Sequence, residues 1–265
     1  MKASTHTFTF LGTGAGCGVP AFFCDCAACQ EAKINPRARR GCCGVMIEGA
    51  QRVLIDTPPD LRHQLLREKV SSIDRLLYTH AHFDHLGGLG ELEYLVRLKR
   101  QKTLPTSASA GALEGIKREF SYLIDCLALE ELKPFATFAF DGATYTALPV
   151  THAPGTFGYL IETPTTKLFY ASDTGPLTPE VAQYVQGADI VALDATFWKN
   201  NWSPTAHHSV QEAIEEGLEL GAGTLYLTHL AMHYDEPVTL AQLEDYLQQY
   251  KGRVKVAFDG LRLKL

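Results

Sequence analysis

A histidine-rich heptapeptide, Thr79 to His85, carries the strongest chemical signal in this sequence. Three imidazoles and one carboxylate occupy six consecutive positions directly after an apolar run: His80, His82, Asp84 and His85. Neutral imidazole and carboxylate suit zinc, manganese and iron, and crowding them at a strand end leaves costly unpaired polar groups unless cations bind there. In an extended turn the three histidines can face two neighbouring points, and Asp84 reaches the second. The heptapeptide therefore indicates a site for two metal ions.

Further candidate ligands stand at the ends of three other apolar runs. His152, Asp173 and His229 each follow a segment rich in β-branched, aromatic and other apolar residues. Any one of them alone would more often be an ordinary polar residue at a strand end than a ligand. Together with the heptapeptide, they are the favoured candidates for completing a two-metal site.

The pattern HxHxDH followed by separate His, Asp and His at strand ends resembles the metallo-β-lactamase superfamily over nearly the whole chain. The resemblance implies two ligand sets joined by one bridging carboxylate: His80, His82 and His152; Asp84, His85 and His229; and Asp173 as the bridge. In the penicillin-hydrolysing branch the positions of Asp173 and His85 commonly differ. The resemblance therefore favours hydrolysis of phosphoesters or thioesters over opening of β-lactams.

Three closely spaced cysteines follow a glycine-rich segment at residues 11–20. Cys24, Cys26 and Cys29 offer three thiolates, one fewer than the tetrahedral set that structural zinc requires. His233 is the best candidate for the fourth ligand because it lies four residues beyond the candidate ligand at 229. Cys17 and His207 stay open as alternatives for that position. The glycine-rich segment lacks a P-loop or dinucleotide pattern and predicts a tight loop instead.

The glycine-rich loop and the CxCxxC cluster resemble the PhnP branch of the superfamily, whose type member is a phosphodiesterase. The similarity extends to short segments along the chain: 18–21, 54–56, 157–162, 172–174 and 258–260. It implies hydrolysis of a small phosphodiester, cyclic ribosyl phosphates included, through a metal-bridging hydroxide. The implied cofactors are two divalent ions at the active site, manganese or zinc with iron as a further candidate, and one structural zinc in the loop at 24–29. Alternatives are a thioesterase like glyoxalase II, an RNA-processing nuclease and a non-catalytic binding protein like PqqB.

Two adjacent histidines, His207 and His208, precede a predicted helix that is capped by Ser209. A leaving alkoxide needs a proton, and a mobile loop could present either imidazole to it. In the PhnP resemblance a histidine two residues before the capping residue contacts the phosphate, and His207 holds that offset. We therefore expect catalytic roles for His207 and Asp84, with His208 as the alternative to His207. Asp56 and Asp194 end two predicted strands and could orient ligands through hydrogen bonds.

The elements that must position these residues alternate between strands and helices. Strands are expected near 7–11, 43–48, 52–56, 74–78, 144–150, 157–162, 166–171, 188–193 and 223–228. A helix is expected over 88–100, and cap patterns at Thr178, Ser209 and Thr239 predict three more. The predicted class is α/β, and the superfamily resemblance implies an αβ/βα four-layer sandwich with the ligands along one edge.

Composition indicates one ordinary folded domain spanning residues 1–265, with 46% hydrophobic and 20% charged residues. No apolar run reaches the length that spans a bilayer, which argues against a membrane partner. A net charge of −6 without a long basic stripe argues against long nucleic acid and favours a small phosphodiester substrate. Seven cysteines and an amino terminus unlike a signal peptide predict a reducing cytoplasm. A homodimer is compatible with the sequence.

Overall fold

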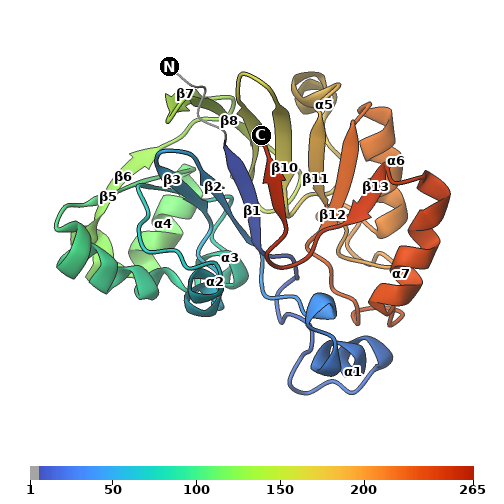
Figure 1. Cartoon of the computed structure of the whole chain (residues 1–265). Helices are drawn as coiled ribbons and strands as arrows, with labels where there is room; N and C mark the ends of the chain where they lie inside the picture. Colours follow the sequence, from blue (N-terminus) through green and yellow to red (C-terminus); the bar gives the residue numbers. More distant parts are fainter. Residues whose placement is uncertain (1–5) are drawn as a thin grey trace.

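The computed structural model describes residues 6–265, and its strands form two seven-stranded mixed sheets (Figure 1). The first sheet has the order β14-β1-β2-β3-β4-β5-β6, with β1 (Thr7–Gly12), β2 (Gly44–Glu48), β3 (Arg52–Ile55), β4 (Arg75–Leu77), β5 (Leu104–Ala108), β6 (Leu127–Glu131) and β14 (Arg262–Lys264). The second has the order β13-β12-β11-β10-β9-β8-β7, with β7 (Thr137–Phe140), β8 (Ala143–Pro149), β9 (Phe157–Glu162), β10 (Lys167–Ala171), β11 (Ile190–Asp194), β12 (Thr224–Thr228) and β13 (Val254–Val256).

Helices cover the outer face of each sheet (Figure 1). The α-helices are α1 (Ala27–Ile34), α2 (Leu61–Arg67), α3 (Phe83–Leu86), α4 (Ala110–Glu119), α5 (Pro179–Val185), α6 (Val210–Glu219) and α7 (Leu240–Leu247). Short 3-10 turns span Pro36–Ala38, Leu89–Leu92, Ser121–Cys126 and Gln248–Tyr250. The layers run helix, sheet, sheet, helix, so the predicted α/β four-layer sandwich is confirmed. Helix α1 projects below the sheets in Figure 1.

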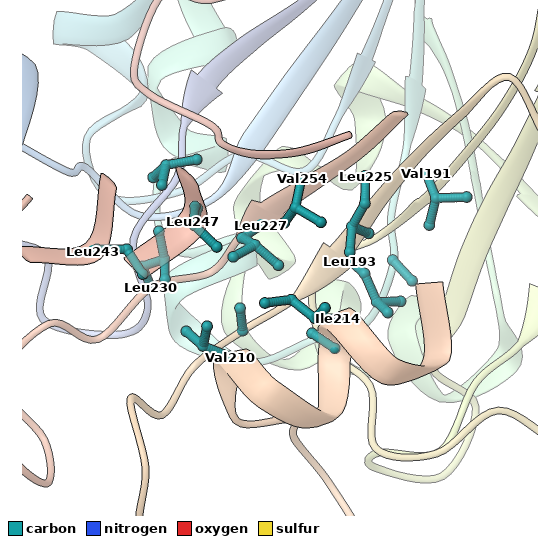
Figure 2. Packing of buried hydrophobic residues seen from close by; sticks show 14 of the residues in the cluster. Val191, Leu193, Val210, Ile214, Leu225, Leu227, Leu230, Leu243, Leu247 and Val254 are labelled. Atoms are coloured by element: carbon teal, nitrogen blue, oxygen red, sulfur yellow. The ribbon is translucent and has the colours of Figure 1, made fainter. Parts of the chain in front are cut away.

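Hydrophobic residues form three layers that hold this sandwich together. Aromatic side chains such as Phe8, Tyr145 and Tyr170 fill the space between the two sheets and are buried. Another layer lies between the second sheet and its helices, where Val210 and Ile214 of α6 pack towards strands β11 and β12 (Figure 2). Fully burying one such side chain contributes roughly 1.5–3 kcal/mol. The sheets are thereby held in place at the edge where the candidate ligands lie.

Strand directions explain why the candidate ligands meet at one edge. Strands β10, β11 and β12 are parallel, and β8 runs with β10 because both are antiparallel to β9. Strand β4 is parallel to β3 in the other sheet. Across the sheets, the Tyr159 hydroxyl donates to the carbonyl of Tyr78 at 2.7 Å, and the Phe157 amide donates to the carbonyl of Thr79 at 2.9 Å. These bonds tie the start of the heptapeptide to the second sheet.

The helix caps read from the sequence are confirmed. The side chains of Thr178, Ser209 and Thr239 each accept a bond from a backbone amide of the following helix, and the latter two form complete capping boxes. The expectation of one α-helix over 88–100 is wrong. A 3-10 turn at Leu89–Leu92 and a π-helical turn at Leu95–Arg100 replace it, and glycines at 87, 88 and 90 weaken regular α-helix at its start. Within residues 6–265, no helix has the length and apolar character needed to cross a bilayer.

Candidate metal centre

Three histidines from different elements bring ring nitrogens to one point. His80 and His82 follow β4, and His152 follows β8. The Nδ1 atom of His82 lies 2.9 Å from Nε2 of His80 and 3.1 Å from Nε2 of His152. The three candidate ligand atoms therefore lie close enough together to bind a single ion.

Hydrogen bonds to the outer nitrogens settle which tautomers these rings adopt. His152 Nδ1 lies 2.9 Å from the carbonyl oxygen of Ala206, which can only accept, so Nδ1 carries the proton. The Thr79 hydroxyl donates to Asp56 and so accepts from His80 Nδ1 at 2.9 Å. Both Nε2 atoms are then bare lone pairs that face His82 Nδ1, whose single proton could satisfy only one of them. A bound cation satisfies all three, so this group fits a divalent metal.

A second group lies beside the first and joins two carboxylates to two imidazoles: Asp84, His85, Asp173 and His229. His85 Nε2 is 2.9 Å from Asp173 Oδ2 and 3.5 Å from Asp84 Oδ2. His229 Nε2 is 3.1 Å from Asp173 Oδ1 and 3.6 Å from Asp84 Oδ2. Asp173 also reaches the first group, since Oδ1 lies 3.9 Å from His152 Nε2.

The buried atoms of the second group lack hydrogen-bond partners. His85 Nε2, His229 Nε2 and Asp173 Oδ2 are all buried without one. Burial alone would lower the pKa of His85, but attraction to Asp173, Asp84 and Asp56 outweighs it and raises that pKa well above its usual value. Burial would raise the pKa of Asp173, but the neighbouring His229 and His85 hold it well below its usual range. Ionised carboxylates facing buried imidazole nitrogens make a donor set that fits a second divalent cation.

Two similar hydrogen-bond networks, called relays below, each use one aspartate and one threonine to orient the histidines. In the first half of the chain, Asp56 accepts bonds from Thr79 Oγ1 and from His85 Nδ1, each at 2.8 Å, and Thr79 in turn accepts from His80. Such outer hydrogen bonds select the tautomer and orientation of a metal-binding histidine.

The second half repeats the arrangement around Asp194. This carboxylate accepts from Thr196 Oγ1 and from His207 Nδ1, both at 2.7 Å, and Thr196 accepts from His229 Nδ1 at 2.8 Å. His207 therefore occupies the place in its relay that His85 has in the other. Both aspartates were candidates from the sequence. The two threonines were not, although each stands within two residues of a predicted ligand or its supporting aspartate.

Strained backbone marks the same edge. Asp56 and His229 have left-handed backbone conformations, with φ of 66° and 54°. Left-handed backbone is uncommon for residues other than glycine, although Asp and His adopt it more often than most, and it costs of order 1–3 kcal/mol. The hydrogen bond from His229 Nδ1 to Thr196 and the packing of β12 hold His229 in that conformation, which turns its ring towards the second group.

His207 and His208 have different surroundings. His207 and the candidate ligands at 152 and 173 have ligand-type atoms within 4.8 Å of one another, and the ring of His207 lies 4.7 Å from that of His152. His208 is buried behind the site, where Nδ1 donates to the carbonyl of Thr174 at 2.7 Å and Nε2 pairs with Glu216 at 2.8 Å. Only His207 is brought to the ligand groups.

The cysteines form a separate cluster. The Sγ atoms of Cys24, Cys26 and Cys29 lie within 4.8 Å of one another. His233 is not a member of that group but lies against it, with Nδ1 3.6 Å from Cys29 Sγ and Nε2 3.3 Å from Cys17 Sγ. Burial raises the pKa of Cys29 to about 12, so this thiol ionises near neutral pH only beside a cation. Burial lowers the pKa of His233, which keeps its ring in the neutral form that binds metals.

A cavity of about 390 Å³ adjoins the first histidine group. It is bounded by His82 and by apolar side chains that include Phe83, Leu86 and Phe120, with Glu119 at its margin. It can take a small uncharged part of a substrate held at the metal centre.

Comparison with known proteins gives this geometry a family. Residues 51–230 match the model of the β-lactamase superfamily domain. A solved diphosphatase from the PhnP family is 29% identical and superposes with a TM-score of 0.86 over 98% of both chains. Zinc-bound PqqB from Methylobacterium extorquens shares the fold, with 20% identity and a TM-score of 0.79 over 98% of this chain and 100% of its own.

An octanoyltransferase from Porphyromonas gingivalis is 25% identical over 95% of this chain, which spans about half the length of that relative. The matched family model covers well over half of the chain and includes the heptapeptide and the three separate candidate ligands. The protein therefore belongs to the metallo-β-lactamase superfamily and is PhnP-like.

Proposed function

We propose that this hydrolase is a metal-dependent phosphodiesterase that acts on a small phosphodiester, cyclic ribosyl phosphates included. The observation that carries the proposal is the pair of adjoining ligand groups, with an intact HxHxDH set and Asp173 between them. Likeness to a PhnP-family diphosphatase supports phosphorus rather than acyl chemistry. The net charge of −6 supports a small substrate over long nucleic acid.

Each ligand group is assigned one divalent ion. His80, His82 and His152 would hold the first, while Asp84, His85 and His229 would hold the second. Asp173 is the assigned bridge because its oxygens lie near nitrogens of both groups. When bound, such ions supply a water nucleophile at neutral pH and neutralise charge on the phosphoryl oxygens.

The reaction breaks one P–O ester bond while water adds to phosphorus. The leaving alkoxide must take up a proton, and His207 is the assigned donor. Its Nδ1 donates to Asp194, so Nε2 can take up the proton that the attacking water loses and pass it to the alkoxide. Asn201 Nδ2 donates to the His207 carbonyl at 2.8 Å and helps to hold the loop that presents this ring.

The cysteine cluster is assigned a structural zinc. Three clustered thiols with an adjacent neutral imidazole match the Cys₃His set of closed structural sites. His233 is the assigned fourth ligand. Cys17 remains the alternative fourth ligand, because its Sγ lies 3.3 Å from Nε2 of the His233 ring.

The test combines metal analysis with hydrolysis assays on the purified, metal-loaded protein. We expect three metals per chain, loss of one in Cys26→Ser, and manganese- or zinc-dependent hydrolysis of bis(p-nitrophenyl) phosphate and a ribose 1,2-cyclic phosphate. Asp84→Ala should abolish both activities while the protein stays folded. Thioesters and RNA complete the panel, and turnover of either with inactivity on both phosphodiesters would refute the proposal.

A further inference from the structure

An aromatic wall, defined as Phe197, Trp202 and Tyr234, stands at one side of the metal centre. The rings of Phe197 and Trp202 lie 4.3 Å apart, and those of Trp202 and Tyr234 are stacked at 5.7 Å with an interplanar angle of 25°. Phe197 is buried, whereas 62% of Trp202 is exposed. The wall is therefore a cluster of three rings, in which Phe197 meets Trp202 edge-on and lies in the core while Trp202 is open to solvent.

The wall adjoins both His207 and Asp84. The ring of Phe197 is 6.2 Å from that of His207. At its other end, a Cβ placed on Gly16 would lie 3.1 Å from the Tyr234 hydroxyl oxygen and 4.0 Å from Asp84 Oδ2. A substrate phosphoryl group held by the metal ligands would thus have the wall beside it.

The loop that carries Trp202 is held in place before any ligand arrives. Asp235, next to Tyr234, accepts bonds from the backbone amides of Lys199 and Asn200, both at 2.8 Å. Asn201 accepts from the Ser203 amide at 2.9 Å and donates to Glu212 at 2.8 Å. An indole displayed on such a loop can bind a ligand without a further cost of ordering the backbone.

We propose that the aromatic wall binds a flat aromatic ring of the substrate by stacking on Trp202, and that the substrate is a nucleotide-type phosphodiester carrying a nucleobase. The inference rests on the proposed function and narrows its substrate class. Every base has a π-face, and stacking one on an aromatic side chain strengthens binding about 5- to 150-fold. Stacking on a ring face does not read the hydrogen-bonding edge of a base, so we expect little discrimination among bases.

Binding is tested first without turnover, through tryptophan fluorescence. The chain has two tryptophans, so Trp198→Phe leaves Trp202 as the sole reporter and Trp202→Phe leaves Trp198. With the metal-loaded protein, adenosine 5′-monophosphate should quench Trp202 saturably, and ribose 5-phosphate should not. The Trp198 reporter should respond to neither. Absence of quenching at Trp202 would overturn the proposal whether or not the protein hydrolyses any ester.

Kinetics then separate stacking from support of the loop. The substrates are adenosine 2′,3′-cyclic phosphate and 1-O-methylribose 2′,3′-cyclic phosphate. They share the scissile ester, but only the first carries a base. Trp202→Ala should lower kcat/KM about tenfold for the first, mainly through KM, and leave the second almost unchanged. Trp202→Phe should retain most of the wild-type preference.

Two further variants serve as controls. Tyr184→Ala removes another exposed aromatic ring, on α5, and should leave kcat/KM unchanged for both substrates. Phe120→Ala opens the cavity beside His82, and loss of the base preference there rather than at Trp202 would place the ring in that cavity. Equal losses on both substrates in Trp202→Ala would also overturn the proposal, since they would indicate a supporting role. Inactivity on every phosphodiester with quenching intact would refute the proposed function while leaving the stacking site standing.

Discussion

Thr79 and Thr196 convert two buried aspartates into supports for histidines in both ligand groups. Each hydroxyl donates to its aspartate and accepts from an imidazole N–H. The carboxylate thereby fixes the orientation of the hydroxyl and, through it, the tautomer and orientation of the ring. Losing an outer partner of this kind typically weakens metal binding 10- to 100-fold. The residues that touch no metal are therefore expected to influence affinity strongly.

We predict that Thr79→Val weakens binding at the His80 group by about 10- to 100-fold, because valine keeps the shape but cannot bond His80 Nδ1. Calorimetric titration of the metal-free protein with zinc measures the change. Thr79→Ser retains the hydroxyl and should bind almost as tightly as the wild type. An unchanged affinity in the valine variant would show that the relay does not orient the ligand.

The loss of kcat on replacing His207 is expected to be larger for leaving groups that need a proton. His207→Asn should lower kcat for an alkyl or cyclic ribosyl ester by about 10²- to 10⁴-fold. It should affect a p-nitrophenyl ester far less, since p-nitrophenolate leaves without protonation. Steady-state kinetics on the two esters provide the measurement. Equal losses on both would assign His207 to metal binding or to support of the loop instead of proton donation.

At the scale of elements, His208 and Glu216 pair with each other and together fasten α6 to the segment after β10, because His208 donates to the Thr174 carbonyl and Glu216 accepts from the Leu177 amide. Burial would lower the pKa of His208, but the adjacent Glu216 carboxylate raises it above the usual value. The folded state then binds the proton more tightly than the unfolded chain does. The stabilisation is fully present below the unfolded pKa of about 6.5 and is lost as pH rises through the higher folded pKa.

Glu216→Gln should therefore lower the free energy of unfolding by about 1–3 kcal/mol at pH 6 and by much less at pH 9. Urea denaturation at both pH values measures this. Glu215→Gln, one position earlier on the same helix, serves as the control and should show little dependence on pH. A cost that does not change with pH would mean that His208 is neutral throughout.

At the scale of the whole molecule, the candidate ligands come from both sheets, so bound ions would join the two halves of the sandwich. His80, His82, Asp84 and His85 follow a strand of the first sheet, whereas His152, Asp173 and His229 follow strands of the second. Without cations, the Asp173 carboxylate and the imidazoles of His85 and His229 lie buried together with polar atoms that lack a hydrogen-bond partner. We therefore expect metal binding and the stability of the entire fold to be coupled.

Removing the metals with a chelator should lower Tm, and adding zinc or manganese should restore it. An ion present at about a thousand times its Kd contributes about 4 kcal/mol, equivalent to a rise of roughly 8–16 °C for a chain of this size. Differential scanning calorimetry with and without metal measures the shift. Asp84→Ala should show a smaller one, and identical shifts in both proteins would place the stabilising ions outside this centre.

Several parts of this protein have signals that lie within a few residues of the sequence. They include the strand-ending histidines of the heptapeptide, the cysteine spacing and the caps at Ser209 and Thr239, whereas the alternation of strands and helices along the chain predicts the α/β class. The prediction of a single helix over 88–100 was wrong because closely spaced glycines offset its apolar pattern. Strands β5 to β7, β13 and β14 were missed because tertiary pairing, more than composition, specifies them.

Which polar residues meet depends on the tertiary structure. Distances such as that from Asp173 to His85, or from Asp194 to His207, join positions far apart in the chain. Adjacent His207 and His208 look alike in sequence, and the turn before α6 alone sends one to the metal centre and buries the other against Glu216. The aromatic wall likewise depends on two loops meeting. Local sequence patterns predict the helices, the strands and the candidate site residues, whereas the packing of the sheets selects which of these residues contact one another.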